Sequence, residues 1–136
     1  MRLWIQISPG SGEPIYVQIV EQISEAIARR ELATGNRLPA VRKLASELVI
    51  NPNTVARAYM VLEQSGLVTT KIGSGTFVAD PKLRSSTDVD INMLTERIDA
   101  LITRGLNLGI DAGDLTAMFK TRLDKFVRKP KNGEKK

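Results

Sequence analysis

Hydrophobic residues near the start of the chain recur at the spacing of an amphipathic helix. They share one helical face because they fall at positions i, i+3, i+4, i+7 and i+11: Tyr16, Ile19, Val20, Ile23 and Ile27. Pro14 suits the first turn, since the N–H that proline lacks has no helical partner there. The turn-forming residues 34–36 are expected to end the helix, and residues 3–7 are predicted to form a short strand or an extended arm.

Two further helices follow. One is predicted from about Val41 to Leu48, and the other opens near Asn51 and ends at Gln64, shortly before a helix-terminating glycine. In the helix that opens near Asn51, one face is expected to pack on the neighbouring helices: Val55, Ala58, Tyr59 and Leu62. The other face is expected to point outward: Asn53, Ala56, Arg57, Met60 and Gln64. Only residues 49–51 link the two helices, as in a helix-turn-helix.

After Gly66 the pattern changes from that of a helix to that of strands. Residues 67–72 and 76–78 are rich in β-branched side chains, and the glycine-rich residues 73–75 between them predict a β-hairpin. Three helices followed by a hairpin are the layout of a winged helix-turn-helix. We therefore predict an α+β, mostly helical fold, with a winged helix-turn-helix DNA-binding domain over residues 1–80.

Beyond a linker at residues 81–87, two more apolar stripes predict a pair of helices within residues 88–128. The first helix is expected to stop at Gly105, and Asp111 is a candidate N-cap of the second. The stripes consist of Ile91, Leu94, Ile98, Leu101 and Ile102, then Leu115, Met118, Phe119, Leu123 and Phe126. Two helices of this size cannot bury such stripes alone. We predict that they form a four-helix arrangement with a second copy, with packing on the winged domain as the alternative.

The net charge of +5 is unevenly distributed along the chain. Residues 1–80 carry eight Lys/Arg and seven Asp/Glu, whereas residues 120–136 carry eight basic and two acidic residues. Such a run is either a solvated tail or a non-specific aid in holding a polyanion. We interpret residues 129–136 as a disordered basic tail, and the charge alone does not establish DNA binding.

The chain contains neither cysteine nor histidine. It therefore lacks the thiolate and imidazole ligands of most transition-metal sites, and also the commonest general base. We expect no metal, no cofactor and no enzyme activity. No apolar run has the roughly 18 residues of a membrane span, and the N-terminus does not resemble a signal peptide, so we expect a cytoplasmic protein.

The candidate base-reading residues lie at the start of the helix that opens near residue 51. Asparagine can bond adenine through two hydrogen bonds, and arginine can do the same with guanine. Residues near the N-terminus of a recognition helix reach deepest into the major groove, which favours Asn51, Asn53 and Thr54. Asn51 can equally be a plain N-cap, and Arg57 can read a base, bind a phosphate or remain a solvated surface charge.

Other cations and a glycine-rich turn are candidates for contacts with the DNA backbone. Arg42 and Lys43 lie in the first turn of their helix, where a cation is disfavoured by the helix dipole unless an anion such as a phosphate accompanies it. The hairpin tip is slim enough to approach a minor groove, although a tight turn explains its composition equally well: Lys71, Gly73, Ser74 and Gly75. A winged helix that binds only protein is the alternative, but a polar, cationic outer face argues against it.

Taken together, these segments resemble the GntR family of bacterial repressors, and in particular its short YtrA-like branch. The matching segments are Pro14–Ile19, Leu38–Ala45, Asn51–Tyr59, Leu62-Glu63, Gly66–Val68 and Gly73–Val78. The resemblance implies DNA contacts at Arg42, Asn53, Thr54 and Gly75. It also implies two helices in place of a large ligand-binding domain, and often a transporter operon as the target. Many members carry serine at the position of Ala40 and arginine at that of Ala56, so the corresponding contacts are in doubt here.

Overall fold

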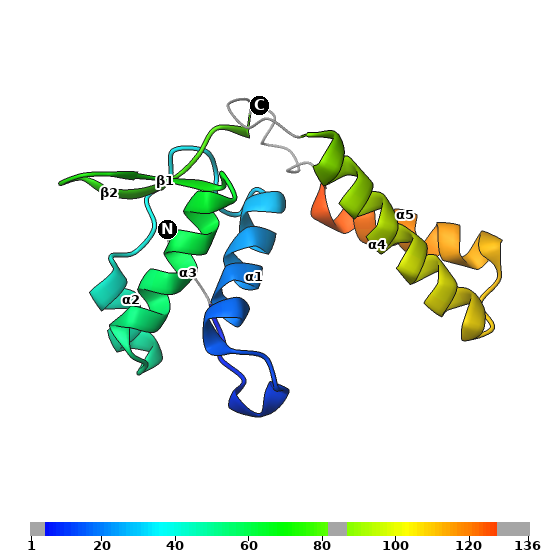
Figure 1. Ribbon diagram of the computed structural model, residues 1–136, viewed down its shortest axis with the longest axis horizontal. Coiled ribbons are helices and arrows are strands. Elements are labelled where there is room, and N and C mark those ends of the chain that lie inside the picture. Colours follow the sequence, from blue (N-terminus) through cyan, green and yellow to red (C-terminus); the bar gives the residue numbers. More distant parts are fainter. Residues whose placement is uncertain (1–4, 82–86, 128–136) are drawn as a thin grey trace, which may run out of the picture. The chain divides into compact units, whose positions relative to one another are not determined.

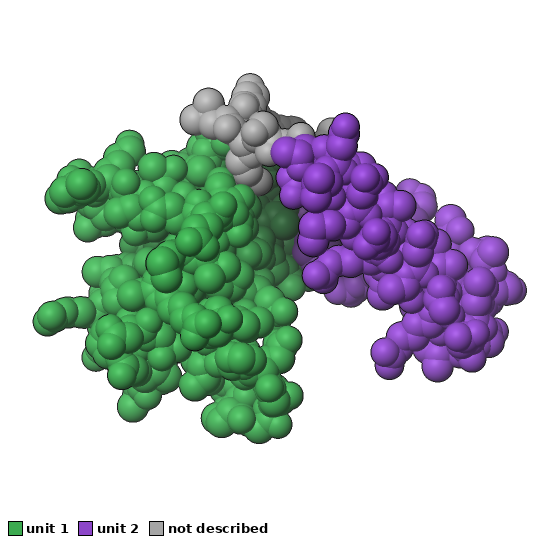
Figure 2. All heavy atoms as spheres, in the orientation of Figure 1, with its two compact units in different colours: residues 1–84 green, residues 85–136 purple. Residues whose placement is uncertain are grey.

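The computed structural model describes residues 5–81 and 87–127, and it divides the chain into two compact units, Met1–Arg84 and Ser85–Lys136 (Figure 2). The elements follow in the order η1 (Pro9–Ser11), α1 (Ile15–Ala28), α2 (Val41–Leu48), α3 (Pro52–Gln64), β1 (Val68–Lys71), β2 (Gly75–Val78), α4 (Asp88–Asn107) and α5 (Ala112–Phe126) (Figure 1). The predicted α+β, mostly helical fold is confirmed.

The first unit is built around α3, which contacts both α1 and α2 (Figure 1). The predicted inner face of α3 is buried: Val55, Ala58, Tyr59 and Leu62. These side chains pack in one core with residues of α1, α2 and the hairpin, chiefly Ile19, Ile23, Leu44, Val68 and Val78. The core therefore fixes α3 by its apolar face, and the opposite face is exposed at Asn53, Arg57 and Met60.

Helix α1 ends earlier than the turn signal at residues 34–36 predicts. Its last residue is Ala28, and Arg30 takes a left-handed conformation with φ of 66°. The chain then turns back because Leu32, only 2% exposed, is buried in the core. A single buried leucine beyond the helix thus overrides the local pattern.

The segment before α1 is an extended arm in its described part rather than a strand. The side-chain amide of Gln22 bonds both backbone groups of Gln6, at 2.9 and 2.7 Å, much as a neighbouring strand would. Gln18, the buried polar residue of α1, accepts from the N–H of Ser8 and donates to its carbonyl. These bonds tie the arm to the first turns of α1.

The hairpin forms as predicted, with antiparallel strands that pair Val68 with Val78 and Lys71 with Gly75. An unpredicted third segment joins it. The N–H of Leu38 donates to Thr76, that of Val78 donates to Asn36, and Arg37 pairs with Phe77. The loop that leads into α2 is therefore hydrogen-bonded to the wing.

The second unit is a hairpin of α4 and α5. A reciprocal capping box between Thr87 and Asp90 opens α4, and Asp111 caps α5 by accepting from the N–H of Asp114, as predicted. The prediction that Gly105 stops the helix is wrong, because α4 continues to Asn107. Gly105 is buried, and a Cβ there would lie 2.5 Å from Cδ2 of Leu115, so this glycine allows α5 to pack closely on α4.

Some expectations fall outside the described residues, namely most of the linker at 81–87 and the basic tail at 129–136. Within the described ranges, no helix has the length and apolar character needed to cross a membrane. Likewise, no group of three or more acidic residues there is placed to hold a metal ion.

Candidate nucleic-acid interface

The N-terminus of α3 presents a cluster of polar side chains. The side-chain oxygen of Asn51 accepts from the N–H of Asn53 at 2.8 Å, so Asn51 is the N-cap that the sequence allowed. Its amide NH₂ remains available as a donor, since the oxygen makes the cap bond. Asn53 is exposed and Thr54 is half-buried. Base contact by these residues stays a prediction.

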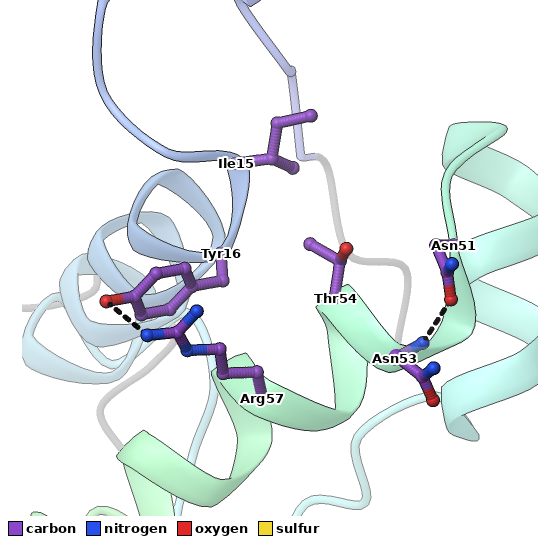
Figure 3. A pocket seen from close by; sticks show the side chains of 6 residues that line it. All are labelled: Ile15, Tyr16, Asn51, Asn53, Thr54 and Arg57. Atoms are coloured by element: carbon purple, nitrogen blue, oxygen red, sulfur yellow. Dashed lines mark hydrogen bonds between the residues drawn. The ribbon is translucent and has the colours of Figure 1, made fainter.

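Arg57, one turn further along α3, lies against α1. Its guanidinium carbon is 3.9 Å from the centroid of the Tyr16 ring, and its Nη2 donates to the Tyr16 hydroxyl at 3.4 Å (Figure 3). The side chain is therefore held by a cation–π contact rather than extended freely into solvent. In the sequence, Tyr16 is only a member of the apolar stripe of α1. Its position in the first turn, where helix side chains are partly exposed, was the only signal of another role.

A hollow of about 390 Å³ lies between the first turns of α1 and α3. Six described residues line it: Ile15, Tyr16, Asn51, Asn53, Thr54 and Arg57 (Figure 3). Four of them are predicted DNA-binding residues, which the fold brings together, and none of the six is acidic. The arrangement offers amide, hydroxyl and guanidinium donors on one concave surface, which suits an anionic partner.

Arg42 and Lys43 are exposed in the first turn of α2, as predicted. The residue before this helix is Ala40, which provides no side-chain cap, so the first N–H groups of α2 lack that partner. The loop ahead of it is fixed from α3, because the Tyr59 hydroxyl donates to the carbonyl of Pro39 at 2.8 Å. The two cations are therefore held at a defined position relative to α3.

The wing residues lie together at the hairpin turn. Gly73 and Gly75 have φ of 82° and 124°, which favour glycine. A Cβ at Gly75 would lie 2.7 Å from Nε of Arg37, so this side chain lies close to the wing, although it is exposed and could shift; the φ angle is what favours glycine here. Arg37 is a second residue that sequence reasoning missed, since it belongs to no helix or strand pattern. Its guanidinium adds a cation beside Gly75, on the same hairpin as Lys71.

The predicted dimerisation residues are on the surface of the second unit. Seven of the eight are exposed, with relative accessibilities of 40% or more: Ile91, Leu94, Ile98, Leu101, Met118, Phe119 and Leu123. The eighth, Leu115, is half-buried against Gly105. Among the described residues of α4 and α5, only Gly105 is buried, so the helix pair has almost no core of its own.

Comparisons with known proteins agree with this arrangement. The model of the family described as bacterial regulatory proteins, gntR family, matches residues 15–78. The HTH-type transcriptional repressor YtrA of Bacillus subtilis is 34% identical over 85% of this chain and 89% of its own length. This relative is a regulator of transcription and not an enzyme.

Solved structures show the same fold. A transcriptional antiterminator from Listeria monocytogenes superposes with a TM-score of 0.80 at 27% identity, over 91% of this chain and 92% of its own. YtrA from Sulfolobus acidocaldarius, a GntR-family transcription factor, superposes with a TM-score of 0.59 at 36% identity, over 73% of this chain and 97% of its own. The AraR DNA-binding domain, solved in complex with operator ORX1, superposes with a TM-score of 0.51 at 26% identity, over 58% of this chain and 99% of its own. With an exposed recognition helix, a wing and these relatives, the chain belongs to the GntR family of bacterial regulatory proteins, in its YtrA-like branch, and is a DNA-binding transcriptional regulator.

Proposed function

We propose that this regulator represses transcription as a homodimer that binds a palindromic operator in double-stranded DNA. The observation that carries the proposal is the donor-rich surface at the start of α3, where Asn53, Thr54 and the cation of Arg57 line one hollow. A repressor role is supported by the similarity to the repressor YtrA. Since such a protein must reach chromosomal DNA, we propose that it acts in the cytoplasm.

Each part of the winged unit is proposed to make a different kind of contact. Asn53 and Thr54 read base edges in the major groove, and the amide of Asn51 can assist them. Arg42 and Lys43 bind phosphates and fix the register without reading sequence. The wing approaches the minor groove or the flanking phosphates through its tip: Lys71, Gly73, Ser74 and Gly75.

A second copy is proposed to cover the apolar faces of α4 and α5. Seven large apolar side chains with 40% or more of their surface exposed form too extensive a patch to remain in water on so small a unit. Two such hairpins can combine into a four-helix arrangement with two-fold symmetry. Two-fold symmetry in turn predicts an operator of inverted half-sites whose centres are about one helical turn, or a multiple of it, apart.

The division of the chain remains part of the proposal. We assign DNA binding to residues 1–80, a linker to 81–87, dimerisation to 88–128 and a basic tail to 129–136. Because only Gly105 is buried among the described residues of α4 and α5, we propose that no separate pocket domain binds a small-molecule effector.

The test is selection of bound duplexes from a random DNA pool, followed by titration of variants on the selected site. Asn53→Ala is expected to cost roughly 1–3 kcal/mol and to relax preference at one position of each half-site. Arg42→Ala is expected to weaken all duplexes alike and to make the salt dependence shallower by about one unit per half-site. Arg30→Ala, which removes an exposed cation just after α1, is the matched control and should change neither.

Three results would contradict the proposal. The first is that no duplex is enriched at low salt, and the second is that single-stranded RNA of the same sequences binds more tightly. The third is that the enriched duplexes contain only single, unpaired half-sites.

A further inference from the structure

We propose that the hollow between α1 and α3 binds one phosphate of the DNA backbone, and that Tyr16 is the residue that positions Arg57 for this contact. The inference rests on the proposed operator binding and assigns to Arg57 one of the three roles that its sequence position leaves open.

The Arg57 side chain is directed toward α1. Its guanidinium stacks on the Tyr16 ring at 3.9 Å and is hydrogen-bonded to the Tyr16 hydroxyl (Figure 3). Tyr16 belongs to α1, which is anchored in the core by the fully buried Ile19 and Ile23. The cation is thus fixed beside the neighbouring helix. Base edges form the floor of the major groove, and phosphates line its two sides. A side chain held at the flank of α3 is therefore placed to contact a phosphate rather than a base edge.

The stack leaves hydrogen-bond donors of Arg57 available for a phosphate. A guanidinium whose face is covered by an aromatic ring keeps its in-plane N–H groups, which match two phosphate oxygens. Only one of these N–H groups is directed at Tyr16 in the structure. Holding the side chain in place also removes rotamer entropy that would otherwise be lost on binding.

The hollow contains further donors and, among its described lining residues, no acidic side chain. The hollow that the guanidinium lines also contains the Thr54 hydroxyl and, beyond Thr54, the amide side chains of Asn51 and Asn53, which are donors for an anion (Figure 3). None of the six described lining residues is a carboxylate that would pair with Arg57 instead. A phosphate therefore finds a cation and neutral donors together, with no internal competitor.

The experiment uses the full chain and its selected operator, with single phosphates replaced one at a time by neutral methylphosphonates. At one phosphate in each half-site, neutralisation is expected to weaken the wild type roughly tenfold and to leave Arg57→Ala unaffected. On unmodified DNA, Arg57→Ala should weaken selected and random duplexes by the same factor and reduce the salt slope by about one per half-site.

Tyr16 is tested by a double-mutant cycle. Tyr16→Leu keeps the apolar bulk of the α1 turn but loses the stack, and it should weaken binding by roughly two- to fivefold in the wild-type background and not at all beside Arg57→Ala. Tyr16→Phe keeps the stack and should recover most of that loss. Arg30→Ala, an exposed cation after α1, is the control, and thermal unfolding verifies that each variant is folded.

Three results would overturn the inference while leaving operator binding intact. The first is that the affinity lost in Arg57→Ala depends on the base pair at one position only. The second is that no methylphosphonate affects the Arg57→Ala protein and the wild type differently. The third is that Tyr16→Leu weakens binding as much in the Arg57→Ala background as in the wild-type background. Failure of the wild type to bind any duplex would instead refute the proposed function.

Discussion

The hydroxyl of Tyr59 in α3 donates a 2.8 Å hydrogen bond to the carbonyl of Pro39, twenty residues earlier in the chain. Pro39 lies in the loop that pairs with β2 and leads into α2. Because Tyr59 is 94% buried by its packing in the core, its ring cannot move without disturbing α3. One bond therefore connects the recognition helix, the entry of α2 and the base of the wing.

Tyr59→Phe removes this bond and leaves the Pro39 carbonyl without its partner. We expect the free energy of unfolding to fall by about 1–2 kcal/mol, because a partly buried acceptor loses its hydrogen bond while the packing of the ring is kept. Urea denaturation measures the loss. Tyr16→Phe, whose hydroxyl is at the surface, is the control and should change stability by less. Equal stability of the Tyr59→Phe protein and the wild type would mean that the bond contributes nothing.

The same tyrosine predicts a pH dependence at high pH. Burial raises the pKa of Tyr59 well above its usual range near 10. The folded state therefore binds this proton more tightly than the unfolded state, so the contribution is complete below pH 10 and is lost as pH rises above it. We expect the wild type to lose up to about 1.4 kcal/mol per pH unit relative to Tyr59→Phe above pH 10. Parallel stability curves for the two proteins between pH 9 and 11.5 would contradict this.

Val49, in the turn between α2 and α3, is strained. It is a β-branched residue with φ of 57°, a left-handed conformation, and its side chain is 87% exposed. The backbone there follows a helix-terminating motif, since the N–H of Ile50 bonds to Ala45 and that of Val49 to Ser46. Val49→Gly is expected to stabilise the protein by about 1 kcal/mol. Val49→Ala should gain less, because it keeps a Cβ.

The stabilities of the Val49 variants are compared by the midpoints of urea unfolding, with the same dependence of the unfolding free energy on urea concentration in each variant. Operator affinity should not change, since neither substitution alters a proposed DNA contact. A glycine variant that is less stable than the wild type would mean that the exposed side chain makes a favourable contact in the folded protein.

The sequence predicted those features that depend on local signals. The bounds of α3 follow from Asn51-Pro52 and Gly66, and its buried face follows from helical spacing. Features that depend on distant partners escaped it. The end of α1 is decided by burial of Leu32, and the role of Gly105 depends on a leucine of the next helix.

The candidate site shows the same division. Asn51, Asn53 and Thr54 were predicted because the start of a recognition helix is recognisable in sequence. Tyr16 and Arg57 are 41 positions apart, and Arg37 meets Gly75 only through the fold. No periodicity encodes such contacts, so these pairs could be found only in three dimensions.

Gly105 allows a test of how α4 and α5 pack. A Cβ at this position would overlap Leu115, so Gly105→Ala is expected to lower the local stability of the hairpin by about 1 kcal/mol despite the higher helix propensity of alanine. In a Leu115→Ala background the space beside residue 105 is open, and Gly105→Ala should raise the local stability of the hairpin by about 1 kcal/mol. Amide hydrogen exchange of α4 and α5 in the full chain measures both. The same sign in the two backgrounds would show that the two residues do not interact.

The last prediction concerns the division of labour between the two units. All members of the buried core lie between Ile5 and Val78, so a chain cut after Asp80 is expected to remain folded, as a monomer. The monomer should still bind one half-site, but weakly. In the dimer the second half-site is engaged at high effective concentration, and removing this linkage should lower apparent operator affinity roughly 10²–10⁴-fold without touching a DNA contact.

Sedimentation of both chains, followed by titration on DNA with one or two half-sites, measures this. A full chain carrying Leu101→Lys and Phe119→Lys is the matched control, because these exposed side chains lie on the apolar faces of α4 and α5. It should behave as the truncated chain does on both kinds of DNA, since a buried lysine in the interface is costly. If the truncated chain stays dimeric and binds two half-sites as tightly as the full chain, another surface forms the dimer. The apolar faces of α4 and α5 would then have to be covered by something other than a second copy.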